Sequence, residues 1–268
     1  MIGPHPADSR SSVATGTTWK TDVARRPANV KSTDEHILQR YSKRRPELPE
    51  GHRLVYEQHY LANRNAQYRT TAVSQKMEAW MHRHVASDLR KGIDPATLEV
   101  GAGTLNHLPY EPAISAYDVV EPFQLLLDHS SHRGRIRHTY RSITEVPTTN
   151  RYDRIVSIAT FEHIEDLPDV ASRCADLLAH DGCLRVGIPN EGTILWRLGT
   201  TLTGLEFWMK YGLDYQTLMR YEHVNTADEI EAVLRCYFRT VSVAVCGISR
   251  RFAFYRFLEC SSPLPRGA

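Results

Sequence analysis

The sequence predicts an α/β fold in which helices cover both faces of a mostly parallel sheet. The first observation is the run Thr97-Leu98-Glu99-Val100-Gly101-Ala102-Gly103-Thr104, a short apolar strand pattern that contains an acid and opens into a Gly-x-Gly turn. The second is the alternation of strand patterns with helical patterns over residues 97–188. The third is Glu121, an acid that closes the next strand pattern 18 residues beyond Gly103 (121 − 103).

These observations also predict where a ligand binds. A Gly-x-Gly bend lets backbone N–H groups approach a ligand where any Cβ would collide with it. An acid about 20 residues further on, at the end of a second strand, is placed to hold the hydroxyl groups of a ribose. Ligands of such sheets bind at the carboxyl ends of the strands, beside the point where the strand order reverses. The residues expected at these ends are Glu99, Gly101, Glu121, Ser142, Ala159 and Glu191.

Seven strands and several helices follow from the local patterns. One helix opens at Pro122, and another runs from Asp166 to Gly182, where glycine would end it in the left-handed conformation. A third opens with the capping box Thr226-x-x-Glu229. The predicted strands are residues 97–100, 113–121, 135–140, 152–159, 183–188, 238–246 and 251–260.

The acid-x-Gly-x-Gly run Glu99-Val100-Gly101-Ala102-Gly103 resembles the first motif of the class I S-adenosylmethionine-dependent methyltransferases. The resemblance covers roughly residues 70–260. It implies a Rossmann-like, doubly wound, mostly parallel seven-stranded sheet with an antiparallel terminal hairpin. It also implies S-adenosylmethionine as the methyl donor and S-adenosylhomocysteine as the product. The cofactor contacts that it implies are Glu99, Gly101, Ala102, Gly103, Asn106, Glu121, Pro122, Ser142, Ile143 and Ala159.

Two positions depart from the common pattern of that family. Asn106 stands where many members carry a third glycine, and Ser142 stands where the family usually has an acid for the adenine amine. The first departure disfavours a nicotinamide-dependent oxidoreductase, since a pyrophosphate needs the glycine-rich helix start of Gly-x-Gly-x-x-Gly. Because Ser142 replaces the usual acid, we expect the backbone of Ile143 to contact adenine instead. An oxidoreductase and a non-catalytic methyltransferase-like binding protein stay open as alternatives.

Length and charge narrow the class of partner. The 268 residues can form one α/β domain with a tail or lid. The chain has 33 basic and 31 acidic residues, and this balance gives no electrostatic case for nucleic acid. Ala159-Thr160-Phe161-Glu162 also replaces the Asn-Pro-Pro-Tyr-like signature of many nucleic-acid methyltransferases. We therefore expect a small-molecule acceptor.

The sequence favours a cytoplasmic protein without membrane insertion. No apolar run approaches the ~20 residues that cross a bilayer, and the first residues lack the features of a signal peptide. The five cysteines are odd in number and have no Cys-x-x-Cys spacing, so we expect buried free thiols in a reducing compartment.

We divide the chain into five parts. Residues 1–33 lack apolar periodicity and read as a disordered tail, and 34–90 form an N-terminal helical segment. Residues 91–192 form the cofactor-binding core, and 222–268 complete it. Between them lies 193–221, an aromatic insertion with three glycines that we predict to be a substrate lid. The alternative for this insertion is a helical hairpin that covers a sheet edge or forms a homodimer contact.

Smaller features of the N-terminal segment have structural interpretations. The basic cluster at 40–46 is expected to pack across the domain rather than bind an anion. Residues 71–90 show the apolar stripe of a core-facing helix, on which His84 is expected to be a packed histidine.

Methyl transfer from a sulfonium needs an aligned nucleophile in a dry site, and a hydroxyl or amine also benefits from a base. His223 is the first candidate base, because it follows the lid and precedes a capped helix. Its alternative role is a hydrogen bond at the helix start. His163, with Glu162, is expected to shape the pocket, and Glu191 to bind a substrate hydroxyl or amine.

No metal site is expected from spacing. The 13 histidines are scattered, and no His-x-x-x-His pair accompanies acids on a convincing helix.

The substrate class follows only from resemblance. Residues 99–108, 188–192 and 222–225 resemble methyltransferases found with bacterial surface-polysaccharide genes. This resemblance implies O-methylation of a sugar or another hydroxyl-bearing metabolite. N-methylation, or methylation of a natural product, is the alternative on the same fold.

Overall fold

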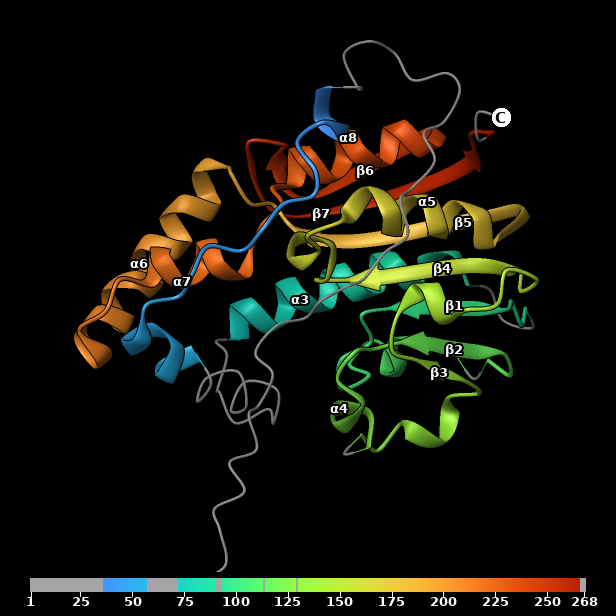
Figure 1. Ribbon diagram of the computed structural model, residues 1–268, viewed down its shortest axis with the longest axis horizontal. Helices are drawn as coiled ribbons and strands as arrows, with labels where there is room; N and C mark the ends of the chain where they lie inside the picture. The colour runs from blue at the N-terminus through green and yellow to red at the C-terminus, as the bar shows by residue number, and fades with distance from the viewer. Residues whose placement is uncertain (1–35, 57–71, 90–92, 113, 129, 266–268) are drawn as a thin grey trace, which may run out of the picture.

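A seven-stranded mixed sheet runs through the middle of the molecule in the order β3-β2-β1-β4-β5-β7-β6 (Figure 1). The computed structural model describes residues 36–56, 72–89, 93–112, 114–128 and 130–265. The strands are β1 Thr97–Val100, β2 Tyr117–Val120, β3 Thr139–Tyr140, β4 Tyr152–Ile158, β5 Leu178–Pro189, β6 Phe238–Ser249 and β7 Phe252–Pro263. β1 to β5 are parallel, and β7 pairs antiparallel with both β5 and β6. The predicted fold class is therefore confirmed.

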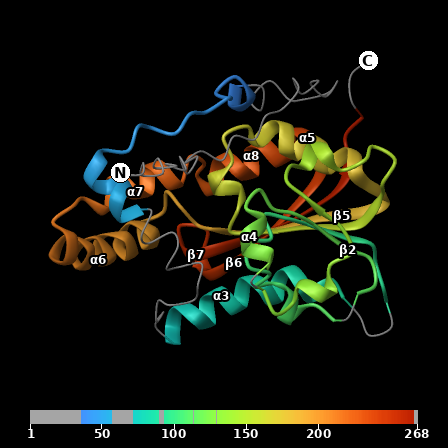
Figure 2. The same ribbon diagram turned by 60° about the horizontal axis from the view of Figure 1, so that its bottom comes forward.

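Helices lie on both faces of this sheet (Figure 2). The α-helices after residue 71 of the described chain are α3 Ala72–Val85, α4 Gln124–Asp128, α5 Leu167–Leu177, α6 Ile194–Tyr211, α7 Tyr215–Glu222 and α8 Ala227–Tyr237. Successive residues of a strand point to opposite faces. Ile155 of β4 accordingly joins the core cluster beneath α5 and α8, whereas Val156 packs with Met81 and Val85 of α3.

The start of β5 corrects one expectation. Gly182 does not end a helix, because α5 ends at Leu177 and β5 already begins at Leu178. The pairing of β4 with β5 is irregular between Tyr152 and Arg154, and Gly182 lies there. A Cβ on Gly182 would approach the Tyr152 carbonyl oxygen to 2.9 Å. The glycine therefore serves a close approach of two strands rather than a helix terminus.

The basic segment at 40–46 packs across the domain, as expected. Lys43 Nζ donates to the carbonyl of Val224 at 2.7 Å and pairs with Glu229 at 2.8 Å. Arg45 donates to the carbonyl of His163 at 2.7 Å. His84 packs on Trp80, with 3.9 Å between ring centroids.

The structure also bears on the expectations about the cysteines, membrane insertion, the N-terminal tail and a homodimer. All five cysteines are free. None of the helices in the described ranges combines the length and apolarity that a membrane crossing needs. The predicted disordered tail lies outside the described residues. Apolar side chains are exposed along α6, and such a surface would suit the predicted homodimer contact. These side chains are Ile194, Leu198, Leu205 and Met209. The homodimer itself stays a prediction.

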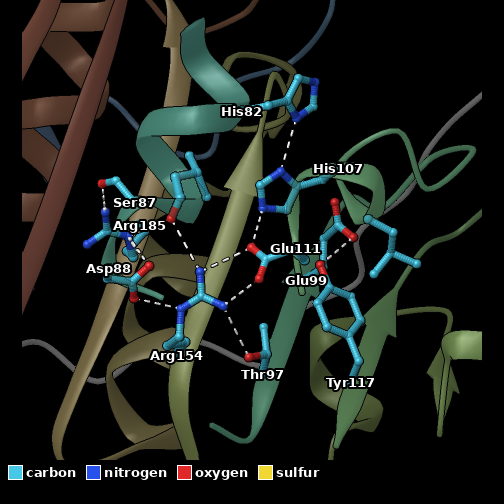
Figure 3. Close-up of polar contacts among 12 residues, drawn as sticks. His82, Ser87, Asp88, Thr97, Glu99, His107, Glu111, Tyr117, Arg154 and Arg185 are labelled. Carbon is cyan, nitrogen blue, oxygen red and sulfur yellow. Dashed lines mark hydrogen bonds and ion pairs between the residues drawn. The ribbon is translucent and has the colours of Figure 1, made fainter. Parts of the chain in front are cut away.

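A buried guanidinium joins three elements on the α3 side of the sheet (Figure 3). Arg154 of β4 pairs with Asp88 in the 3-10 turn η1 (Ala86–Asp88) at 2.7 Å. It also bonds both carboxylate oxygens of Glu111, at 3.0 and 3.1 Å. Burial alone would raise the pKa of Glu111, but hydrogen bonds from His107 and Arg154 hold that pKa below its ordinary value. Arg154 thereby fixes α3 and the segment after β1 to the sheet.

We expect Arg154→Met to lower the free energy of unfolding by about 3–5 kcal/mol, because it leaves the buried Glu111 carboxylate without its counter-ion. Urea unfolding measures this change. Arg151→Met is the matched control, since exposed Arg151 donates only to nearby carbonyls, and it should stay within about 0.5 kcal/mol. Equal losses in the two variants would contradict this account of Arg154.

Candidate functional site

The turn after β1 is built on two left-handed glycines. Gly101 has φ +78° and Gly103 has φ +52°, a region that side chains other than glycine rarely adopt. A Cβ on Gly101 would overlap the side chain of Thr160, which follows β4. A Cβ on Gly103 would meet nothing within 4 Å. Gly101 therefore serves close packing within the protein, whereas Gly103 borders open space.

Glu121, which directly follows β2, holds this turn. One carboxylate oxygen accepts the N–H of Gly103 at 2.7 Å, and the other accepts the N–H of Phe123 at 2.9 Å. The residue is only 4% exposed, so its carboxylate is oriented before any ligand arrives. A carboxylate has about four acceptor positions, and these two backbone N–H groups fix the orientation of the Glu121 carboxylate.

Glu99 of β1 provides a second buried acid. It accepts the hydroxyl of Tyr117 at 2.9 Å. Burial raises the pKa of Glu99 to about 8, although the Tyr117 hydrogen bond acts in the opposite direction. This carboxyl group is therefore largely neutral at pH 7 and can become charged when a cation arrives beside it.

These groups open into a cavity of about 670 Å³ at the carboxyl ends of the strands. Eight of the ten predicted cofactor residues are among those that line it: Glu99, Gly101, Ala102, Gly103, Asn106, Glu121, Pro122 and Ala159. Ser142 and Ile143 are not among the described lining residues. The Ser142 side chain accepts the Thr144 N–H and caps the 3-10 turn η4 (Ile143–Glu145), while Ile143 is 1% exposed and belongs to the core.

Sequence reasoning missed the contribution of α3 to the cavity. Met81 and His82 line it, together with His107 from the segment after β1. His82 Nδ1 lies 3.1 Å from His107 Nδ1, and His107 Nε2 lies 2.6 Å from Glu111 (Figure 3). The apolar stripe of α3 predicts a buried face but does not indicate that the same helix reaches a ligand cavity.

The predicted lid forms a helical hairpin. α6 and α7 pack against each other at one end of the molecule (Figure 1). Both helices contribute side chains that line the cavity. They include Phe207, Tyr211, Tyr215, Leu218 and Met219. The hairpin thus walls the cavity, and whether it moves as a lid stays a prediction.

The three candidate catalytic residues lie together next to this cavity. His223 follows α7, and its Nδ1 lies 2.5 Å from Glu191 Oε2. Its ring meets that of His163 edge to face, with 4.8 Å between centroids. His163 is a cavity-lining residue, whereas His223 and Glu191 are not among the described ones.

Neighbouring acidic side chains raise the pKa of His223. Burial by itself lowers the pKa of His223, but the hydrogen bond and charge of Glu191, with Glu162 and Glu222 nearby, leave that pKa raised. The structural alternative for His223, a hydrogen bond at the start of α8, is not what the structure shows, since Thr226 and Glu229 form that capping box themselves.

The segment between β1 and β2 is unusual for a nucleotide-binding sheet. Its described residues contain the 3-10 turn η2 (Leu108–Tyr110) and no α-helix. Leu105 takes φ +68° and its side chain is fully buried. The chain therefore lacks, in its described part, the long helix whose N-terminus receives a pyrophosphate in dinucleotide-binding proteins.

No protein-family model matches the sequence, and no curated protein matches it significantly. Solved structures do match the fold. An S-adenosylmethionine-dependent methyltransferase from Thermotoga maritima has a TM-score of 0.53 and 13% identity over 79% of this chain and 97% of its own. The magnesium protoporphyrin IX methyltransferase of Synechocystis has a TM-score of 0.53 and 14% identity, covering 76% and 95%. An N-methyltransferase from Bradyrhizobium japonicum, in complex with S-adenosylhomocysteine, has a TM-score of 0.50 and 14% identity, covering 73% and 89%.

These similarities establish the fold. The chain has the fold of the class I S-adenosylmethionine-dependent methyltransferases, with an antiparallel β7 inserted between β5 and β6. The fold that the glycine motif at residues 99–103 implies by resemblance is therefore confirmed.

We expect the two glycines to respond differently to alanine. Gly103→Ala should cost about 1–2 kcal/mol of unfolding free energy, the strain of a left-handed alanine. Gly101→Ala adds an overlap with Thr160 to the same strain and should cost about 1–3 kcal/mol more. Urea unfolding of both variants measures the difference. A Gly101→Ala protein as stable as Gly103→Ala would contradict the close packing assigned to Gly101.

Proposed function

We propose that this protein is an S-adenosylmethionine-dependent methyltransferase that acts on a small hydroxyl-bearing molecule. The observation that carries the proposal is the Glu121 carboxylate, which is fixed to the turn at Gly103 and lines the cavity. Nucleotide-binding sheets of this kind hold ribose hydroxyls with an acid at the end of the second strand, which supports this role for Glu121. The fold, shared with solved methyltransferases, supports the same conclusion.

The residues of the cavity fit this cofactor. Gly103 leaves open space where a Cβ would obstruct a ligand. The cofactor carries a methionyl ammonium and a sulfonium, and the acids Glu99 and Glu121 provide complementary charge. When bound, S-adenosylmethionine supplies the electrophilic methyl group. The protein's task is then to hold the acceptor in line and to exclude water, for which the aromatic wall of α6 and α7 is suited.

A nicotinamide cofactor fits less well. Its pyrophosphate needs a helix N-terminus after the glycine turn, and the described residues there form only the turn η2. S-adenosylmethionine has no phosphate and does not require that helix.

The acid–histidine cluster supports an oxygen acceptor. Glu162, His163, Glu191 and His223 lie together beside the cavity, which His163 lines, and they offer groups that can bind a hydroxyl or receive its proton. Among these four, His163 is a described cavity-lining residue and His223 is not. An acceptor in the cavity would therefore reach His163 more directly than His223, the base that the sequence predicts. A sugar or another hydroxyl-bearing metabolite is the acceptor that the resemblance implies. An amine acceptor is the alternative, and product analysis after incubation with both classes distinguishes them.

We expect S-adenosylmethionine to bind the wild-type protein and to bind Glu121→Gln more weakly by about 1.5–3 kcal/mol, the value of a charge-assisted hydrogen bond. Calorimetric titration measures both affinities. Glu206→Gln is the matched control, because Glu206 lines the same cavity but belongs to α6 rather than to the end of β2. No binding to the wild-type protein would refute the proposed function, and equal affinities would refute the role of Glu121.

The raised pKa of Glu99, about 8, predicts a pH dependence of cofactor binding. At pH 6 the carboxyl is protonated and gives the methionyl ammonium no charge partner. As the pH rises toward 8 the carboxylate forms, so the affinity should increase by at most tenfold per pH unit, with proton release on binding. Glu99→Gln should bind weakly, with less change between pH 6 and 8. A wild-type affinity independent of pH would contradict the assignment.

A further inference from the structure

Three side chains of the types that bind metal ions meet beside the cavity, and His163, one of them, lines it. Glu162 and His163 lie in the 3-10 turn η5 (Phe161–His163), and His223 follows α7. One ligand atom of each lies within 4.8 Å of those of the other two. We infer that this cluster binds a divalent transition-metal ion through the Glu162 carboxylate and Nε2 of each histidine.

The buried carboxylate is the observation that requires a partner. Glu162 is 2% exposed, and its Oε2 makes no hydrogen bond in the structure. Its other oxygen lies 3.9 Å from His163 Nε2, beyond hydrogen-bond distance. A buried polar atom without a partner destabilises the folded protein, and a charged one does so more strongly. A cation between these three side chains would satisfy that oxygen.

Both histidines are oriented as metal ligands usually are. His163 Nδ1 lies 2.8 Å from the carbonyl of Glu222, which can only accept, so Nδ1 carries the hydrogen. In the neutral ring, Nε2 then has the lone pair. His223 has the equivalent arrangement, with Nδ1 on the Glu191 carboxylate. Metal-bound histidines almost always donate their second nitrogen to a carboxylate or a backbone carbonyl in this way.

The backbone holds the two halves of the cluster together. The carbonyl of Glu162 accepts the N–H groups of Val224 and Asn225, at 2.9 and 3.1 Å. The Asn225 side chain also donates to the carbonyls of Phe161 and Ile164, at 2.9 and 2.6 Å. His223 therefore stays beside η5 although it is 60 positions further along the chain (223 − 163). That separation explains why the spacing of histidines in the sequence predicts no metal site.

The donor set indicates which ions fit. Two imidazole nitrogens and one carboxylate suit zinc, iron(II) or cobalt(II), whereas magnesium and calcium prefer oxygen ligands alone. The His163 side chain is 32% exposed and lines the cavity, so further coordination positions face that side. Water or an acceptor oxygen would occupy them. This use by the acceptor rests on the proposed function, but the binding of the ion does not. With an ion bound, His223 acts as a ligand rather than as a base.

The test is titration of metal-free, full-length protein with Co²⁺, followed by visible absorption, and with Zn²⁺, followed by calorimetry. We expect one ion per chain, with a cobalt spectrum free of thiolate charge transfer and with weaker binding of Mg²⁺. Glu162→Gln and His163→Gln should weaken binding at least tenfold. Glu191→Gln removes only the charge of the group that accepts the His223 Nδ1 hydrogen, so it should weaken binding less than either ligand variant, by about tenfold or less.

Matched controls separate this site from incidental binding. His180→Gln changes a histidine that also pairs with a carboxylate, Asp181 at 2.9 Å, but on the exposed surface, and it should bind the ion like wild type. Absence of stoichiometric binding, or wild-type affinity in Glu162→Gln and His163→Gln, would overturn the inference. Circular dichroism confirms that each variant is folded.

Titrating the same samples with S-adenosylmethionine separates the two proposals. Ion binding without cofactor binding would retain the metal site and refute the proposed function. Cofactor binding without ion binding would refute the metal site alone.

Discussion

The close approach of two turns, at Gly101 and at Thr160, is the constraint on which the site depends. β1 has β2 on one side and β4 on the other, so the chain leaves β1 and β4 in opposite directions and a crevice opens between them. The Thr160 hydroxyl bonds the carbonyl of Gly101 at 3.3 Å and fills the space that a Cβ would need. Ala159, beside it, is held at φ +49°. Such strained positions persist only where the surrounding structure enforces them, and here they form one side of the cavity.

The interior charges of the molecule connect this crevice to the rest of the fold. Arg154 and Arg185 both donate to the Val85 carbonyl at the end of α3, where helix carbonyls have no partner of their own. The helix is thereby held against β4 and β5, and its His82 reaches the cavity. The same guanidinium of Arg154 neutralises Glu111, which in turn bonds His107 (Figure 3). The same hydrogen bonds of Arg154 and Arg185 therefore stabilise the fold and position His82 and His107 at the cavity.

Local sequence patterns predict those features of the structure that depend on residues close together in the chain. The glycines of the β1 turn and Glu121 could be placed because the turn and the strand that follows it are close in sequence. The seven strands follow from apolar runs, although β3 contains only two residues and β5 starts earlier than its pattern indicates. A glycine after a helical pattern predicts a helix end, whereas Gly182 accommodates the neighbouring carbonyl of Tyr152.

Residues that meet only through tertiary structure could not be predicted in this way. His82 reaches the cavity because the buried arginines fix α3, and no local pattern records that contact. Glu162, His163 and His223 each have an ordinary local context, and only the hydrogen bonds from the segment after α7 bring them together.

The most direct test of the central claim is the crystal structure of the protein with S-adenosylhomocysteine. This account predicts the nucleoside in the cavity, with the ribose hydroxyls within hydrogen-bond distance of the Glu121 carboxylate and the amino group of the ligand beside Glu99. A ligand bound elsewhere, or an adenosine whose ribose does not contact Glu121, would contradict it.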